Sequence, residues 1–398
     1  MFHPLIKDTP WPATPGTRTA LGPVPGAAST AAIAELAAQT EMQRPVVVLV
    51  ASSTEAHTLE RELPLFLPDP VPILTLPDWE TLPYDHFSPH QDIVSQRLRT
   101  LYELPKLSEG IVILPITTAM LRTPPQHYIE GNTLDLSVGD TFDADGFAKS
   151  LALNGYRAVE TVFEHGEFAV RGALLDVFPM GSDTPYRIDL LDDEVETLRT
   201  FDPENQRTLA DASQQLMLSP VREELFTQTS KQRARQAILD AAAEIDMPTR
   251  QVQPLLDDLA NGIPFMGIEA FRPAFAGELS TLFDYLPQNA LLVSVDPMAI
   301  AQQAVHVWDH YQKGRESFLE DGALSLPAEV HALNPNQMNA RTAQFNQIRC
   351  HALQMVDELG LVEVSEEPLA FRIPRNTGLT NQLAQSRGEK TPLRGLAI

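Results

Sequence analysis

The sequence is poor in cysteine and in long apolar runs, and each scarcity excludes classes of protein. Its 398 residues contain one cysteine, Cys350, so no disulfide can form within the chain, which fits a reducing compartment. Residues 1–16 contain prolines and polar breaks where a signal peptide needs an apolar core. The longest apolar run, residues 46–51, is too short to cross a bilayer. We therefore expect a soluble, cytoplasmic protein without a membrane partner.

Basic residues are scarce as well. The chain has 29 Lys and Arg against 53 Asp and Glu, a formal net charge of −24. A surface this acidic repels phosphate backbones over most of its area, which argues against a large non-specific DNA-binding face but leaves room for a small basic patch. Proline is abundant by contrast, and its 33 residues are dispersed, which indicates frequent turns instead of a disordered tract.

Residues 1–122 alternate predicted helices and strands. The helices are expected over residues 30–43, 52–66 and 88–102, and the strands over residues 46–50, 73–76 and 111–116. The strand runs are continuously apolar, which is typical of a parallel sheet buried on both faces. Ser52 and Glu55 have the spacing of a capping box, and Ser88 followed by Pro89 favours another helix start. This segment therefore predicts an α/β, doubly wound fold.

The pattern becomes β-rich over residues 123–215. A helix is expected over residues 144–154 and strands over residues 173–178, 186–190 and 195–201, the last two joined by an acidic turn. Residues 216–345 return to helices, over 221–245, 249–261 and 298–318, with one buried strand over 291–295. We predict that this third segment completes the first sheet around an inserted α+β domain. The chain turns polar beyond about Glu366, and residues 346–398 are interpreted as a linker or the start of a following domain.

Two long motifs are specific enough to indicate a family. The first reads LPDWETLPYDHFSPHQD from Leu76, and the second reads EHGEFAVRGALLDVFP from Glu164, continued by YRIDLLDDE from Tyr186. Both resemble the N-terminal, UvrB-like region of bacterial transcription-repair coupling factors (Mfd). The chain passes from Tyr84 to Ser88 without room for the long aromatic hairpin with which UvrB probes damaged DNA. A damage-verifying role is therefore not expected.

The resemblance implies a fold and a function. Residues 1–122 and 216–345 would form a degenerate RecA-like (P-loop NTPase-like) domain, and residues 123–215 would be an inserted UvrA-interaction domain. The chain would be an adaptor that binds UvrA and recruits nucleotide excision repair to stalled RNA polymerase. RNA polymerase, double-stranded DNA, ATP and Mg would be bound by other domains of a longer ATP-dependent DNA translocase, outside this chain.

The expected phosphate loop lacks the residues that nucleotide binding needs. The stretch before the first helix contains Gly22, Pro23, Pro25, Gly26, Ala28 and Ser29. A working loop places a lysine before its Ser or Thr, but Ala28 stands there, and the two prolines remove N–H donors. We therefore predict no cofactor and no catalysis in this chain. An active helicase domain and a DNA-binding module are the alternatives.

The resemblance also implies a binding site for UvrA. Two family arginines match Arg171 and Arg187, and Leu191 stands where the family has phenylalanine. Because side chains alternate along a strand, Arg187 and Leu191 share the face opposite the apolar one and are expected to point outward. Arginine forks beside an exposed apolar residue are typical of protein-binding patches. The alternative is that both arginines only pair with Asp189 or Glu167 on a solvated face.

Other polar clusters do not indicate chemistry. Asp85, His86, His90 and Asp92 match no standard zinc spacing, so we predict no metal site. Glu164, His165 and Glu167 lack an accompanying nucleophile. The acidic run at residues 192–194 is interpreted as a solvated turn.

Overall fold

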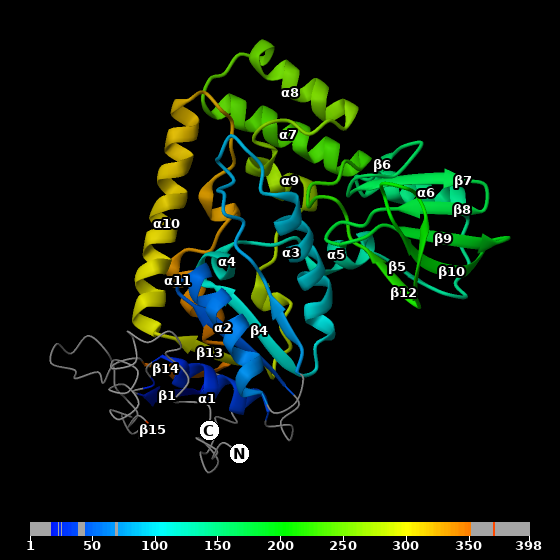
Figure 1. The fold of residues 1–398 in the computed structure, drawn as a ribbon. Helices are drawn as coiled ribbons and strands as arrows, with labels where there is room; N and C mark the ends of the chain where they lie inside the picture. The colour runs from blue at the N-terminus through cyan, green and yellow to red at the C-terminus, as the bar shows by residue number, and fades with distance from the viewer. Residues whose placement is uncertain are drawn as a thin grey trace, which may run out of the picture.

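The computed structural model describes residues 17–22, 24, 26–38, 44–67, 71–351 and 369–370. The predictions that concern residues 1–16, Pro23, Pro25, and residues 352–368 and 371–398 lie outside the described residues. Within that part, the chain forms a parallel-sheet domain and a smaller β-rich module beside it (Figure 1).

The larger domain is built on one parallel sheet. Its strands are β1 (Arg18–Gly22), β2 (Pro45–Val50), β3 (Ile73–Thr75), β4 (Gly110–Pro115), β13 (Leu291–Val295), β14 (Asn346–Cys350) and β15 (Leu369–Ala370), in the order β15-β1-β14-β13-β2-β4-β3. Every residue of β2 and β4 is buried, which explains their continuous apolar runs. The chain leaves this sheet after β4 and returns at β13, so the sheet draws its strands from both ends of the sequence.

Helices cover both faces of the sheet. One face packs on α1 (Ala27–Ala37) and α2 (Ser53–Phe66), and the other on a thicker layer made by α3 (Gln91–Glu103), α4 (Ile116–Met120), α5 (Gln126–Asn132), α7 (Gln228–Glu244), α8 (Thr249–Asn261), α9 (Arg272–Ala276), α10 (Pro297–Glu320) and α11 (Pro335–Thr342). Alternate residues of one strand serve the two layers: Val48 packs against α1 and α2, and Leu49 belongs to the opposite cluster. The doubly wound α/β prediction is confirmed.

The β-rich module is a twisted sheet with its main core on one face and a small buried cluster on the other. Its strands are β6 (Arg157–Ala158), β7 (Glu167–Arg171), β8 (Leu174–Val177), β9 (Tyr186–Leu191), β10 (Glu194–Phe201) and β11 (Thr208–Ser213), in the order β11-β10-β9-β8-β7-β6. They run antiparallel except for the β6–β7 pair. Helix α6 (Ala144–Leu153) and the two-stranded ribbon of β5 (Leu134–Ser137) and β12 (Gln215–Leu218) close the module's core.

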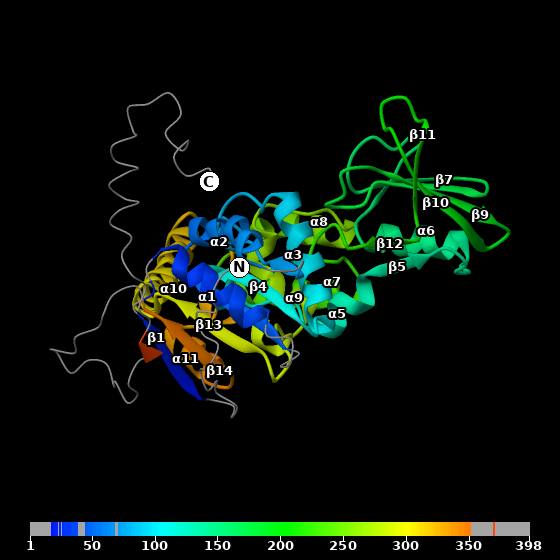
Figure 2. The same ribbon diagram turned by 60° about the horizontal axis from the view of Figure 1, so that its bottom comes forward.

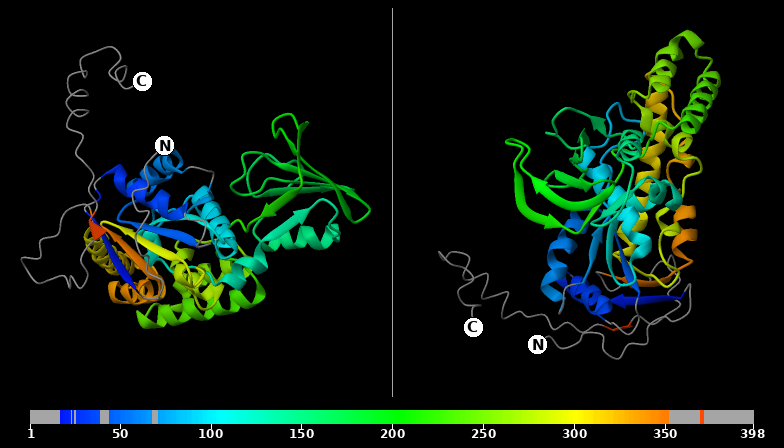
Figure 3. Two further views of the ribbon diagram at one scale, coloured as in Figure 1. Left: turned by 90° about the horizontal axis from the view of Figure 1, so that it is seen from below. Right: turned by 90° about the vertical axis from the view of Figure 1, so that its right-hand side faces the viewer.

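The module projects from the side of the larger domain where α3 and α5 lie (Figures 2 and 3). The hydroxyl of Tyr102 on α3 donates a hydrogen bond to Asp135 of β5. Gly181 of the module approaches α3 so closely that a Cβ built on it would lie 2.5 Å from the Ser95 Oγ. These contacts seat the module directly on α3.

Several predicted helix ends were wrong, and capping side chains explain where the helices start. Ser52 caps α2 as predicted, since its side chain accepts a hydrogen bond from the Glu55 N–H. Helix α3, however, begins at Gln91 with His90 as its cap, and not at Ser88–Pro89. Helix α7 begins at Gln228 because Thr227 caps it, so most of residues 221–227 are not helical. Helix α1 starts at Ala27 and ends at Ala37, earlier than expected at both ends.

The predicted segment boundaries differ from the observed packing in three places. Ile129 of α5 belongs to the core of the larger domain, so the module's own packing begins at β5. Strand β12 pairs with β5, so the module continues past residue 215. Strand β14 lies between β1 and β13, and residues 346–350 are therefore part of the sheet and not of a linker.

Candidate functional site

The junction between β1 and α1 has no side-chain cation. Gly26 adopts a φ of 60°, and the Ser29 hydroxyl donates a hydrogen bond to the Gly26 carbonyl over 2.8 Å. That hydroxyl is therefore engaged within the turn. Residues 26–38 include no lysine or arginine, and the Thr30 hydroxyl donates to the carboxylate of Glu62, 2.7 Å away. The described part of the junction lacks the positive charge on which a phosphate loop depends.

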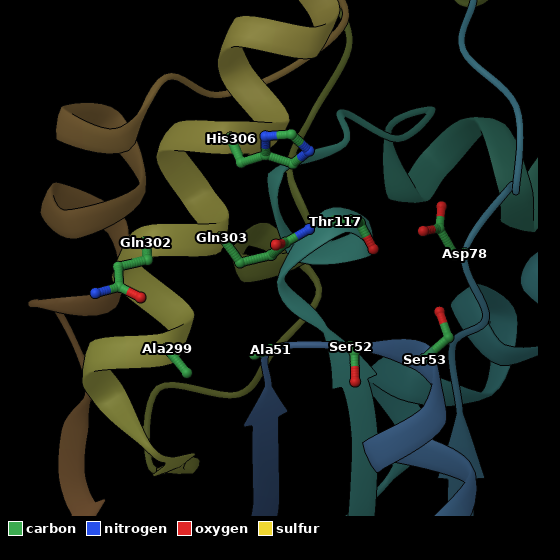
Figure 4. A pocket seen from close by; sticks show the side chains of 9 residues that line it. All are labelled: Ala51, Ser52, Ser53, Asp78, Thr117, Ala299, Gln302, Gln303 and His306. Atoms are coloured by element: carbon green, nitrogen blue, oxygen red, sulfur yellow. The ribbon is translucent and has the colours of Figure 1, made fainter.

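A cleft of about 560 Å³ opens at the carboxyl ends of β2 and β4, beside α10 (Figure 4). It is lined by Ala51, Ser52, Ser53, Asp78, Thr117, Ala299, Gln302, Gln303 and His306. This is the edge of an open α/β sheet at which ligands commonly bind. The lining nevertheless has one carboxylate and neither lysine nor arginine, and at the start of α2 the Glu55 N–H donates to the Ser52 hydroxyl while the Glu55 carboxylate accepts from the Ala51 N–H. The residues that line the cleft thus include no arginine or lysine to pair with a phosphate group.

The face of the module's sheet opposite α6 carries the predicted binding residues, and part of it is covered by a small buried cluster of Val162, Ala169, Phe178 and Phe201. Along β9, Ile188 and Leu190 point into the core, whereas Arg187 and Leu191 lie on the other face, as the alternation predicts. Leu191 is 65% exposed. Arg171 of β7 pairs with Leu174 of β8 on the same face. We call Arg171, Leu174, Asp176, Arg187 and Leu191 the arginine–leucine face.

Arg187 does not project outward, which corrects the prediction. Its side chain is only 14% exposed, and its Nε and Nη2 donate to the two oxygens of Asp176 over 2.7 and 2.9 Å. Its Nη1 donates to the Gln206 carbonyl and to Thr208, and its guanidinium lies 4.7 Å from the centre of the Phe201 ring. The reason is register, since Asp176 stands directly opposite Arg187 across β8 and β9. The hydrogen bonds to Asp176 raise the pKa of Arg187 above its ordinary value, against the effect of burial.

The alternative pairing with Asp189 or Glu167 is also wrong. Asp189 accepts hydrogen bonds from Thr197 and Arg199, and Glu167 is engaged by Arg157. Burial alone would raise the pKa of Asp189, but the hydrogen bonds from Thr197 and Arg199 lower it overall. Asp189 and Glu167 are therefore engaged by other arginines, and Asp176 is the carboxylate that pairs with Arg187.

Arg171 and two leucines form the accessible part of the face. The Arg171 side chain is 45% exposed, and its Nη2 lies 3.7 Å from the Asp176 carboxylate. Leu174 stands between Arg171 on one neighbouring strand and Asp189 on the other, and it is 37% exposed. Sequence reasoning missed Leu174 and Asp176, although strand alternation together with the hairpin register would have placed both on this face.

The first long motif serves the core. Trp79 is buried, and the Arg272 guanidinium lies 4.1 Å from the centre of its ring. Arg97 of α3 is fully buried and donates to the Pro77 carbonyl over 2.6 Å. The motif therefore contacts two buried arginines, Arg97 and Arg272, near the place where the module joins the larger domain.

Buried carboxylates from the segment between β12 and α7 meet these arginines. Glu223 accepts a hydrogen bond from Arg272 over 2.7 Å, and Glu224 lies 3.8 Å from the Arg272 Nε. Burial, followed by the negative charges of Glu269 and Glu223, raises the pKa of Glu224 to about 8. This segment leads from the module back to the larger domain, so the ion cluster stabilises the connection between the two.

The remaining polar clusters have structural partners. His165 stacks on Phe178, with ring centres 4.0 Å apart, and its Nε2 lies 2.7 Å from the Ser182 carbonyl. No group of three or more His, Cys, Asp or Glu within the described ranges could hold a metal ion. None of the helices in that part of the chain is long and apolar enough to span a membrane.

Comparison with known proteins identifies the relatives of both units. The UvrB interaction domain model matches residues 134–223, which agrees with the module's packing boundaries. The transcription-repair-coupling factor of Haemophilus influenzae is 37% identical over 337 residues, covering 85% of this chain and 29% of that protein. That of Escherichia coli is 40% identical over 284 residues, covering 71% and 24% respectively.

UvrABC system protein B of Vibrio vulnificus is 25% identical over 413 residues, covering 93% of this chain and 58% of that protein. The chain spans less than a third of the length of the two coupling factors above. By these matches, the chain is homologous to the N-terminal, UvrB-like region of transcription-repair-coupling factors.

Proposed function

We propose that this chain is an adaptor that binds UvrA through the arginine–leucine face of its UvrB interaction domain. The observation that carries the proposal is the exposure of Arg171, Leu174 and Leu191 around the buried Asp176–Arg187 pair. Exposed apolar side chains supply burial on binding, and the arginine fork supplies directional hydrogen bonds. In a longer coupling factor, the adaptor would connect stalled RNA polymerase to nucleotide excision repair.

The proposal treats the larger domain as a RecA-like scaffold without a working nucleotide site. Three observations support this view: alanine at position 28, the engagement of the Ser29 hydroxyl within its own turn, and the lack of basic residues lining the sheet-edge cleft. Catalysis would then reside in the ATP-dependent motor domains of the parent protein, with ATP and Mg. The same proposal includes the division of the chain into a RecA-like scaffold and an inserted UvrA-interaction domain.

Binding to purified UvrA tests the adaptor function. Arg187 is a poor position for charge reversal, because a glutamate there would be buried against Asp176. Arg171→Glu and Leu191→Asp alter exposed side chains instead and are expected to weaken binding about tenfold or more each. Leu65→Asp is a matched control, since Leu65 is 74% exposed on α2 of the other domain.

The binding constants are measured by biolayer interferometry, and circular dichroism checks the fold. Unchanged affinity in folded Arg171→Glu and Leu191→Asp would refute the assigned face. A rise in melting temperature with Mg-ATP, or ATP hydrolysis by the purified chain, would support a helicase domain. A salt-dependent gel shift with duplex DNA would support a DNA-binding module.

A further inference from the structure

Asp176 is almost completely buried, although it lies on the same face of the module's sheet as exposed leucines. It is 2% exposed, whereas Leu191 on the same face is 65% exposed. Strand β8 lies between β7 and β9, so Asp176 has Ala169 on one side and Arg187 on the other. Its carboxylate therefore lies within reach of both family arginines but is almost inaccessible to a partner protein.

Burying a carboxylate is unfavourable unless its oxygens are hydrogen-bonded and its charge is paired. Arg187 meets both oxygens with two nitrogens, a planar arrangement that leaves its guanidinium little rotational freedom. Thr208 and the ring of Phe201 hold the same guanidinium from other directions. Arg187 is therefore fixed before any partner arrives.

Arg171 is held less tightly by the same carboxylate. Its Nη2 lies 3.7 Å from Asp176 Oδ2, the oxygen that also accepts from Arg187 Nη2. A single carboxylate thus draws the two guanidinium groups toward one point. Preorganised side chains lose less conformational entropy on binding than mobile ones, which favours affinity.

We propose that Asp176 is a positioning residue of the arginine–leucine face, which fixes Arg187 and orients Arg171 for the partner without contacting it. The inference rests on the proposed binding of UvrA and adds a residue to that site. It also predicts the opposite change in binding affinity from the one that simple charge attraction predicts when the carboxylate is removed. Removing the carboxylate makes the face more positive, which strengthens long-range attraction to an acidic surface, whereas loss of positioning weakens binding.

The test compares Asp176→Asn with Asp189→Asn in binding to purified UvrA. Asp189 lies on the same face and pairs with Arg199, so the control removes the same charge near Arg187 but leaves both hydrogen bonds from Arg187 to Asp176 in place. Positioning predicts binding about tenfold weaker for Asp176→Asn, mainly through faster dissociation, and a change under about threefold for Asp189→Asn. Equal or tighter binding by folded Asp176→Asn, or equal losses in both variants, would overturn the inference.

A double-mutant cycle adds a readout that a merely structural role would not move. If Asp176 acts through Arg187, Asp176→Asn weakens binding much less in an Arg187→Ala background than in the wild type. Additive losses contradict the inference. The Arg187 Nε–H resonance provides a spectroscopic check, since it should move much further on Asp176→Asn, which alters its hydrogen-bond acceptor, than on Asp189→Asn.

If Asp176→Asn fails to fold, Arg187→Lys provides a second test of the positioning role. Lysine retains the charge but cannot make the two-pronged contact with Asp176, so positioning predicts about a tenfold loss and plain charge predicts none. Failure of the wild-type chain to bind UvrA would refute the proposed function. Wild-type binding with unaffected Asp176→Asn and Arg187→Lys would refute the positioning role alone.

Discussion

Replacing Glu224 by glutamine should remove most of a pH dependence of stability that the buried ion cluster creates. Glu224 is 6% exposed on the segment between β12 and α7. Glu269 and Glu223 lie close enough to repel the ionised form of Glu224, whereas the Arg272 guanidinium attracts it. Burial and the two neighbouring carboxylates keep Glu224 protonated, with its pKa raised to about 8. A neutral glutamine reproduces that protonated state at every pH.

The magnitude follows from the difference between the folded and unfolded states. The ordinary pKa of the group is 4.5, and the folded value is about 8. A raised folded pKa gives stability that is fully present below about 4.5 and is lost as pH rises through about 8. Each pKa unit corresponds to ~1.4 kcal/mol, so the loss between these limits has a ceiling on the order of 5 kcal/mol. That pKa already includes the attraction to Arg272, and relaxation and water entry around the buried cluster reduce the expected loss to about 2–4 kcal/mol.

Urea unfolding at pH 5, 6, 7 and 8 measures this effect directly. The quantity of interest is the free energy of unfolding of Glu224→Gln minus that of the wild type, because titrating groups that do not interact with Glu224 cancel in the difference. We expect it to grow steadily between pH 5 and 8. Glu320→Gln, at an exposed position near the end of α10, is the control and should show no such trend. Parallel curves for wild type and Glu224→Gln would refute the reasoning.

Three further predictions concern buried contacts. Arg272→Met leaves Glu223 buried without its nearest cation and should lower the free energy of unfolding by about 3–5 kcal/mol, measured with urea; a loss under ~1 kcal/mol would contradict it. Gly181→Ala places a Cβ 2.5 Å from Ser95 at a φ of +69° and should cost about 1–3 kcal/mol, partly recovered by adding Ser95→Ala, in thermal melts. Burial raises the pKa of the Cys350 thiol to about 12, so Ellman's reagent should label it only in denaturant, and rapid native labelling would contradict its burial.

The local sequence was sufficient to predict the bounds of those elements whose own residues show an unambiguous pattern. The apolar run of β13 and the amphipathic pattern of α8 gave their observed bounds, Leu291–Val295 and Thr249–Asn261. Burial on both faces demands an uninterrupted apolar run, and a helix with one buried face demands the 3.6-residue period. The two long motifs were equally informative about the family, since their length makes a chance match improbable.

Helix starts were less predictable because several polar side chains compete for the capping position. His90 caps α3 although Ser88 and Pro89 have the stronger local signal, and Thr227 delays α7 by seven residues relative to the predicted start at 221. In the second case the extended residues carry Glu223 into the ion cluster. A contact with a distant arginine thereby outweighs local helix propensity.

The sequence by itself determined that Arg187 and Leu191 share one face of a strand, because alternation is a property of the strand alone. Only the tertiary structure decided that Arg187 is held down by Asp176 while Leu191 stays exposed. Strand register places Asp176 opposite Arg187, and that register is set by the packing of the whole sheet on α6 and the β5–β12 ribbon. In the same way, residues 346–350 form a strand because their backbone pairs with β1 on one side and with β13 on the other. The local sequence pattern does not show this pairing.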